Sequence, residues 1–229
     1  RARGAAAWTG GRSEGRVWLP GAGRCLLHDA KRPPSRPRRG ALPGRGLPAP
    51  WKNCVVRQSE PLSDEDLRII ADQLGRAPRG LVAVAWRSPC GCPGVIATEP
   101  RLPGGSPFPT FYYLTDPRAV VGCSRLEADG VMASMTARLG QDEELAAAHR
   151  RAHESYLANR RAHGEVPELE GISAGGMPRR VKCLHALLAH ALAAGPGVNP
   201  LGDETLELLG PFWDEPCPRH GAPAGEAAS

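Results

Sequence analysis

The hydrophobic and polar positions of the chain follow two different periods, one in its middle and one towards its C-terminus. Three short runs of β-branched, apolar and aromatic residues, at 81–86, 94–98 and 111–115, predict β-strands. The segment 99–110 between the last two runs holds four prolines and two glycines, which predicts a shaped loop. A small antiparallel sheet of about three strands is the simplest arrangement of these elements.

Apolar residues at helical spacing flank this sheet region on both sides. Ser63 followed by three acidic residues predicts a helix N-terminus, and Gly75 predicts its end. Towards the C-terminus, further helices are predicted over 116–130, 131–140, 142–162, 177–195 and 202–210. The sequence therefore predicts an α+β fold in which a small antiparallel sheet packs with four to six helices, mostly in the C-terminal half.

Charge and composition separate the first fifty residues from the rest. Residues 1–50 contain eleven Lys and Arg against two acidic residues and are rich in glycine and proline, whereas the remainder carries 18 basic and 22 acidic residues. We expect a disordered basic leader (1–54), a single domain (55–213) and a disordered tail (214–229). Since the domain is net acidic, nucleic-acid binding is not expected of it; the leader could bind nonspecifically.

The sequence predicts a cytoplasmic protein. No apolar run approaches the ~18 residues that a membrane span needs, and no secretory signal pattern is present. The seven cysteines are odd in number and scattered, which favours reduced thiols over a disulfide framework.

Four phrases of the sequence carry a family resemblance: PRLPGGSPFPTFYYLT, SRLEADGVM, HESYLANR and GGMPRRVKCLHALLAHALAAGPGVNPLGD. Over about residues 55–210 the chain resembles the bacterial family called domain of unknown function 501. The family brings no established activity. Its members often lie in chromosomes beside a septum-formation initiator and an exopolyphosphatase-like phosphatase, which implies an adaptor role in cell division or the envelope. Where this family usually has Cys-Pro-Cys-Gly-x-Pro, the chain has SPCGCP. Ser88 replaces the first family cysteine and Cys90 matches the second, whereas Cys92 has no counterpart in the family pattern.

The leading functional hypothesis is a polar pocket that binds a small anionic or phosphorylated ligand. A Gly-Gly turn leading into the predicted 177–195 helix would expose backbone N–H groups at the positive end of the helix dipole, and nearby cations would add to the attraction. Residues of the 99–115 region and of the 116–130 helix could converge on the same place. The candidate ligand-binding residues are Arg101, Thr110, Tyr113, Arg125, Gly175, Gly176, Arg179, Arg180, Lys182 and His185.

The alternative hypothesis is a metal-binding structural or interaction domain, with zinc the possible ion and no cofactor firmly predicted. Its candidate ligands are Cys90, His153, Cys183 and His190. A regular helix over 181–194 would place Cys183 and His185 on opposite faces, which argues against a compact site there. A nucleophilic Cys183 or Cys90 with a histidine base is a third possibility. The sequence names neither a reaction nor a protein partner, and whether the protein is an enzyme stays open.

Overall fold

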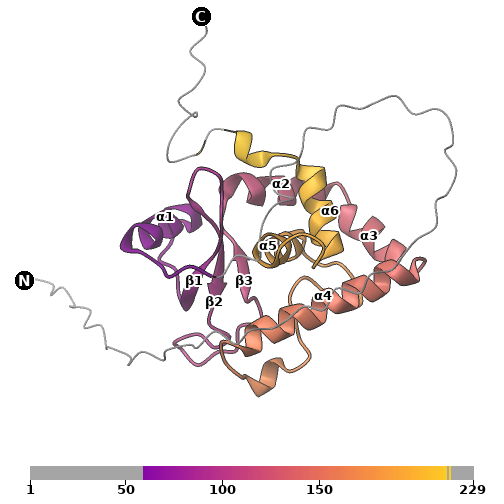
Figure 1. Ribbon diagram of the computed structural model, residues 1–229, viewed down its shortest axis with the longest axis horizontal. Coiled ribbons are helices and arrows are strands. Elements are labelled where there is room, and N and C mark those ends of the chain that lie inside the picture. Colours follow the sequence, from indigo (N-terminus) through magenta and orange to yellow (C-terminus); the bar gives the residue numbers. More distant parts are fainter. Residues whose placement is uncertain (1–58, 216, 218–229) are drawn as a thin grey trace, which may run out of the picture. The chain divides into compact units, whose positions relative to one another are not determined.

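The computed structural model describes residues 59–215 and residue 217 (Figure 1). The predicted basic leader lies outside these residues. The helices and strands follow in the order α1 (Asp64–Leu74), β1 (Leu81–Arg87), β2 (Pro93–Thr98), β3 (Tyr112–Leu114), α2 (Pro117–Ala128), α3 (Val131–Leu139), α4 (Glu143–Arg161), η2 (Pro167–Leu169), α5 (Leu184–Ala194), α6 (Pro200–Leu209) and η3 (Phe212–Asp214). The predicted α+β class with a helix-rich C-terminal half is confirmed.

The three strands form one antiparallel sheet in the order β1-β2-β3, as predicted. All six residues of β2 are buried, which requires cover on both faces of the sheet. Figure 1 shows how this is achieved: α1 lies on one side of the strands and α5 on the other. The sheet is therefore a middle layer, and α5 faces β3 most closely.

Helix α1 shows how local sequence fixes an element. The Ser63 hydroxyl accepts a hydrogen bond from the Asp66 N–H (3.1 Å), and the Asp66 carboxylate accepts one from the Ser63 N–H (3.0 Å). This capping box satisfies N–H groups that have no partner within the helix. At the other end Gly75 adopts φ = 65°, a left-handed conformation that glycine takes without strain.

Helix α5 is the centre of the helical half. Eight of its eleven residues are buried, and it packs against the sheet on one side and against α6 on another. At Gly202 of α6, an added Cβ would collide with the Leu187 carbonyl of α5, so only glycine allows the two backbones to approach so closely. The side chain of Tyr156, from α4, reaches the sheet side of this core, where its hydroxyl accepts the Phe111 N–H (2.6 Å).

The predicted 177–195 helix is wrong at its start. The regular helix begins at Leu184, and Cys183 is its N-cap residue in an extended conformation (φ −157°, ψ 113°). Residues 177–183 form a turn and coil instead, with a cis Met177–Pro178 peptide bond. The Gly-Gly pair thus lies eight residues before the helix, and its N–H groups are not at a helix dipole.

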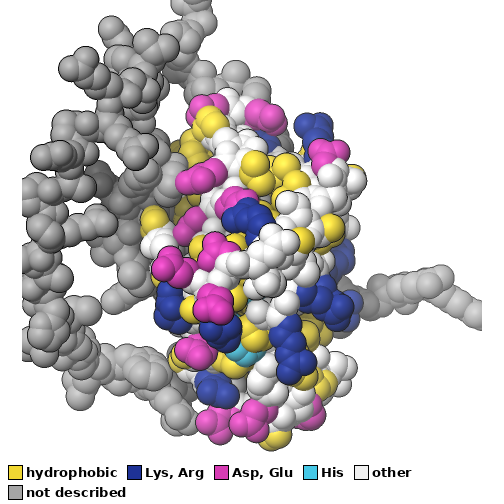
Figure 2. Space-filling model, turned by 90° about the vertical axis from the view of Figure 1, so that its right-hand side faces the viewer, with side chains coloured by type: hydrophobic (Ala, Val, Ile, Leu, Met, Phe, Trp, Pro, Cys, Tyr) yellow, Lys and Arg dark blue, Asp and Glu magenta, His cyan; other side chains and the backbone are white. Residues whose placement is uncertain are grey.

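The helices and the surface of the described residues have two further properties. No helix among the described residues is both long and apolar enough to span a bilayer. On the face shown in Figure 2, acidic and basic side chains lie interspersed. That face therefore offers no extended surface of one charge sign for a nucleic acid.

Candidate anion-binding cleft

A cleft of about 1120 Å³ lies between the sheet, the start of α2 and the segment that precedes α5. Its walls come from β3 and its flanks, the first turns of α2, the end of α1 and a segment of residues 171–183, which we call the glycine loop. Tyr112, Val120 and Ile172 supply apolar surface, and no Asp or Glu is among the lining residues. The cleft is thus an apolar cavity with basic groups on one wall.

The glycine loop turns back on itself and presents its cations at the tip. The Lys182 N–H donates to the Gly175 carbonyl (2.7 Å), and the Arg180 N–H donates to the Gly176 carbonyl (3.2 Å). Gly176 has φ = 92°, and an added Cβ would lie 2.8 Å from the Arg180 carbonyl, so this closure requires glycine. Buried Met177 and Val181 anchor the turn on either side of its exposed arginines.

The exposed cations of this loop are Arg179, Arg180 and Lys182. None of the three forms an ion pair with any described residue. The loop is fixed from behind, where the Val181 N–H donates to the Thr136 hydroxyl of α3 (3.0 Å). Its charge therefore faces the cleft and solvent without a protein counter-ion.

At the α5 end of the cleft, the side chains of Glu127, Cys183 and His185 converge within 4.8 Å of one another. The His185 Nδ1 lies 3.0 Å from the Glu127 carboxylate and 3.8 Å from the Cys183 sulfur. Its Nε2 lies 3.2 Å from the Val120 carbonyl, an acceptor only. With acceptors at both nitrogens, His185 is placed to carry two protons and a positive charge.

The contacts with Cys183 first and Glu127 second outweigh burial and raise the pKa of His185 to about 9. At neutral pH the cleft therefore has a fourth positive group. Glu127 also accepts the Leu184 N–H (2.7 Å), so it caps α5 in place of Cys183, which makes no side-chain cap. The sequence argument that separated Cys183 from His185 is wrong because Cys183 precedes the helix.

Eight of the ten predicted ligand residues line this cleft: Thr110, Tyr113, Gly175, Gly176, Arg179, Arg180, Lys182 and His185. The other two do not. Arg101 binds both carboxylate oxygens of Glu168 (2.8 and 2.6 Å), and Arg125 lines a different hollow between α2 and α6. The predicted convergence of Arg101, Arg125 and Arg180 is therefore not found.

The four predicted metal ligands are likewise dispersed. His153 lines the cleft, and its Nδ1 lies 2.8 Å from the Ser173 hydroxyl. His190 is fully buried, stacked on Tyr112, and burial lowers its pKa to about 4. Cys183 belongs to the His185 cluster and Cys90 to a separate group of thiols. These four residues do not form one site.

The predicted site residues do not include Glu127, Cys92 or Cys217, which take part in clusters of ligand-type side chains. The sequence shows Glu127 only as an acid near the end of a predicted helix. Cys217 lies in the segment taken for a disordered tail; the structure describes it as buried. Ser88, in the place of a family cysteine, instead donates to the buried Asp116 carboxylate (2.5 Å).

Comparison with known proteins finds a match over most of the helical half and the cleft. A family profile described as "Protein of unknown function (DUF501)" matches residues 84–207, more than half of the chain. The chain belongs to this family. The match includes β2, β3, the helices from α2 to α5 and most of α6, and with them most of the cleft wall. No curated protein and no solved structure matches the chain.

Proposed function

We propose that the cleft binds a small anionic ligand, specifically a phosphorylated organic molecule. One observation carries this proposal: three Lys and Arg side chains line the cleft without an ion pair to any described residue, and no acidic side chain is among the lining residues. In proteins, basic groups that lack counter-ions and face a concave, partly dry surface attract anions strongly.

The shape of the cleft supports an organic ligand over a bare inorganic ion. Its volume of about 1120 Å³ is slightly larger than the usual range of about 300–1,000 Å³ for small-molecule sites. The cations lie on the glycine loop, whereas Tyr112 of β3 and Val120 and Val121 of α2 offer apolar surface. A phosphate group at the loop with an organic part against β3 and α2 would use both.

Calorimetric titration with pyrophosphate and a set of nucleotides tests the proposal. The Arg180→Ala and Lys182→Ala variants should each weaken binding about tenfold or more, because each removes one charge-assisted contact worth roughly 1.5–3 kcal/mol. Arg151→Ala is the matched control, since Arg151 is exposed on α4 and outside the cleft. No binding by the wild type, or equal losses in the control, would contradict the proposal.

A second candidate function is nucleophilic catalysis by Cys183 on the bound anion. The Cys183 sulfur lines the cleft, lies at the N-terminus of α5 and is 3.8 Å from the His185 ring, so it is placed to attack a ligand bound in the cleft. The sulfur would give the electron pair for a new bond to the ligand, the bond to the leaving group would break, and the leaving group would take a proton from water. Water would then hydrolyse the intermediate and return the thiolate.

Alkylation followed by peptide mass spectrometry tests this second candidate. Cys183 should react with iodoacetamide much faster than Cys123, which is fully buried and whose pKa is raised to about 12 by burial. Bound pyrophosphate should protect Cys183 by occupying the cleft. If Cys183 reacts no faster than Cys123, the candidate fails while the anion-binding proposal still stands.

The earlier metal alternative needs other residues, because its proposed ligands are dispersed. In the Glu127, Cys183 and His185 cluster, hydrogen bonds already occupy both ring nitrogens of His185. A metal there would have to displace the Nδ1 proton and a cap of α5. The adaptor role and the cytoplasmic location remain predictions from sequence.

A further inference from the structure

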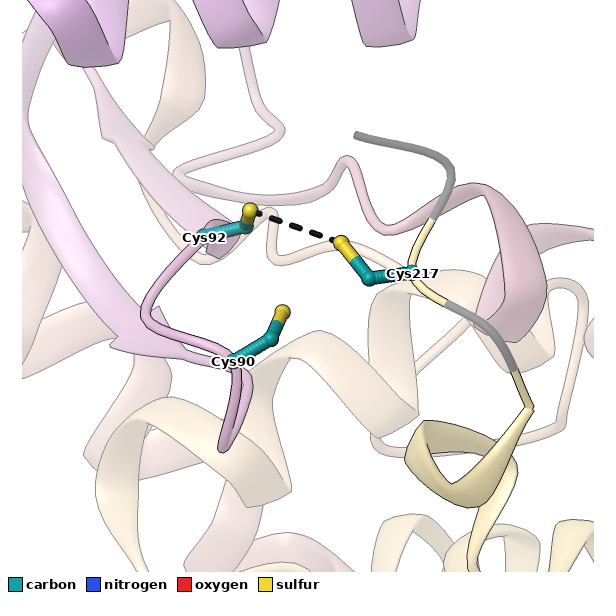
Figure 3. Close-up of side chains that lie close together, drawn as sticks. All are labelled: Cys90, Cys92 and Cys217. Carbon is teal, nitrogen blue, oxygen red and sulfur yellow. Dashed lines mark hydrogen bonds between the residues drawn. The ribbon is translucent and has the colours of Figure 1, made fainter. Parts of the chain in front are cut away.

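Three cysteine side chains from distant parts of the sequence meet outside the cleft. Cys90 and Cys92 come from the turn between β1 and β2, and Cys217 follows η3. Figure 3 shows the three sulfurs pointing toward one another across a small space. All three lie within 4.8 Å of one another, and those of Cys92 and Cys217 are 3.7 Å apart.

The separation of the sulfurs fits a shared metal ion better than a disulfide. A disulfide requires about 2.05 Å between sulfurs. In a tetrahedral zinc site with Zn–S bonds of about 2.3 Å, two sulfurs lie about 3.8 Å apart. The Cys92–Cys217 distance of 3.7 Å is that edge length, and a disulfide between these two would leave the third converging thiol unused.

The groups around the three sulfurs would favour a zinc ion bound by thiolates. Cys92 and Cys217 are 3% and 7% exposed, so two of the three sulfurs are shielded from water. The guanidinium of Arg118 lies 3.9 Å from the Cys90 sulfur, where it would offset the negative charge of several thiolates on one ion. The buried carboxylate of Asp116 holds that guanidinium in place (2.7 Å).

The same arginine connects the thiols to the C-terminal segment. Arg118 donates to the backbone carbonyls of Trp213 (3.3 Å) and Glu215 (2.9 Å), on either side of the end of η3. The backbone leading to Cys217 is therefore fixed beside the β1–β2 turn. This brings the sulfur of Cys217, which follows Cys92 by 125 positions in the sequence, close to the other two sulfurs.

We propose that Cys90, Cys92 and Cys217 bind a structural zinc ion that fastens the segment after η3 to the β1–β2 turn. Each thiol loses its proton to solvent as its sulfur binds the ion.

Elemental analysis of the full chain, purified without chelators or a histidine tag, tests the proposal. We expect one zinc per chain, and a loss of that zinc in the Cys92→Ser and Cys217→Ser variants. Cys123→Ala and Cys183→Ser are the matched controls, because they remove a buried core thiol and the cleft thiol respectively. Wild-type protein free of zinc, or equal zinc in Cys217→Ser, would overturn the proposal.

Replacement of the ion by cobalt covers the case in which a cysteine variant does not fold. Cobalt bound to the full wild-type chain should give visible d–d bands of a tetrahedral site and an ultraviolet thiolate-to-cobalt band. A cobalt spectrum without thiolate ligation, or a Cys92–Cys217 disulfide found by peptide mapping of the native protein, would overturn the site.

Discussion

The glycine loop and helix α5 are consecutive in the chain, yet they differ in almost every physical respect. The loop exposes three cations and closes through backbone hydrogen bonds of its own. The helix has no Lys, Arg, Asp or Glu and buries eight of its eleven residues. The border falls between Cys183 and Leu184, where the Glu127 carboxylate caps the helix.

Because of this difference, we expect substitutions in the helix and in the loop to affect different properties, folding stability and ligand binding respectively. Substitutions in α5 should act on folding, because its side chains are surrounded by the sheet and α6. Substitutions at the tip of the loop should act on ligands, because those side chains contact little protein. His185, in the first turn of α5, belongs to both regions.

The largest effect is expected from Leu187→Ala in the buried helix. Leu187 is fully buried, so its truncation leaves a cavity and should lower the free energy of unfolding by about 2–5 kcal/mol. Chemical denaturation measures this loss. The matched control is Leu208→Ala on α6, which is 51% exposed and should change the free energy by less than about 0.5 kcal/mol. Equal effects of the two substitutions would contradict the assignment of α5 to the core.

The next largest effect is expected from His190, as a loss of folding stability when the pH falls. Burial lowers the pKa of His190 to about 4, against 6.5 in the unfolded chain, so the unfolded state binds the proton first as pH falls. Stability that is present above pH 6.5 should therefore decline towards pH 4, by up to about 3 kcal/mol from this residue. The rings of Tyr112 and Tyr156 and the Asn199 amide surround it.

Denaturation of a His190→Gln variant across pH 4–7 measures this contribution. The variant should lose less stability over that range than the wild type, whatever its stability at pH 7. His149 is also fully buried and has a pKa lowered mainly by burial, so part of the acid dependence should persist. Identical slopes for wild type and variant would show that His190 is protonated equally in both states.

The elements that could be predicted from sequence are those whose signals are local. The capped start of α1 and the three strands were each placed to within about a residue. The start of α5 was not, because Met177, Val181, Leu184 and Leu188 repeat at helical spacing and are all buried, although the first two anchor a turn. A single sequence gives no sign that the backbone at Gly176 closes on itself.

Sequence reasoning names eight residues that line the cleft, because most of the charge on its wall comes from one continuous segment. Arg101 was misassigned because its partner, Glu168, is 67 positions away. Cys217 was placed in a tail because nothing near it in the sequence indicates the thiols it meets across 125 positions.

Glu127→Gln should have an intermediate effect at the border between loop and helix. The amide can still accept the Leu184 N–H, so stability should fall by only about 1 kcal/mol, the scale of a helix cap. The pKa of His185 should fall from about 9, because the variant lacks the carboxylate charge near Nδ1. NMR titration of the ring measures that shift.

The same variant has a consequence for pyrophosphate binding. In the wild type, the charge of His185 is lost as pH rises through about 9, so binding and the stability due to this ion pair should both weaken there. In Glu127→Gln, binding should weaken at lower pH. Glu143→Gln, an exposed position on α4, should leave the profile unchanged. A shifted profile in the control alone would contradict the role given to Glu127.

The smallest effect on stability is expected at the tip of the glycine loop. Arg179 is exposed and forms no ion pair with a described residue, so Arg179→Ala should change the free energy of unfolding by less than about 0.5 kcal/mol. The same substitution should still weaken pyrophosphate binding, because it removes a positive charge from the cleft wall. Denaturation and calorimetry on one protein sample measure both quantities. A variant that loses stability but keeps its affinity for pyrophosphate would contradict the expectation that loop residues act on binding and helix residues on folding.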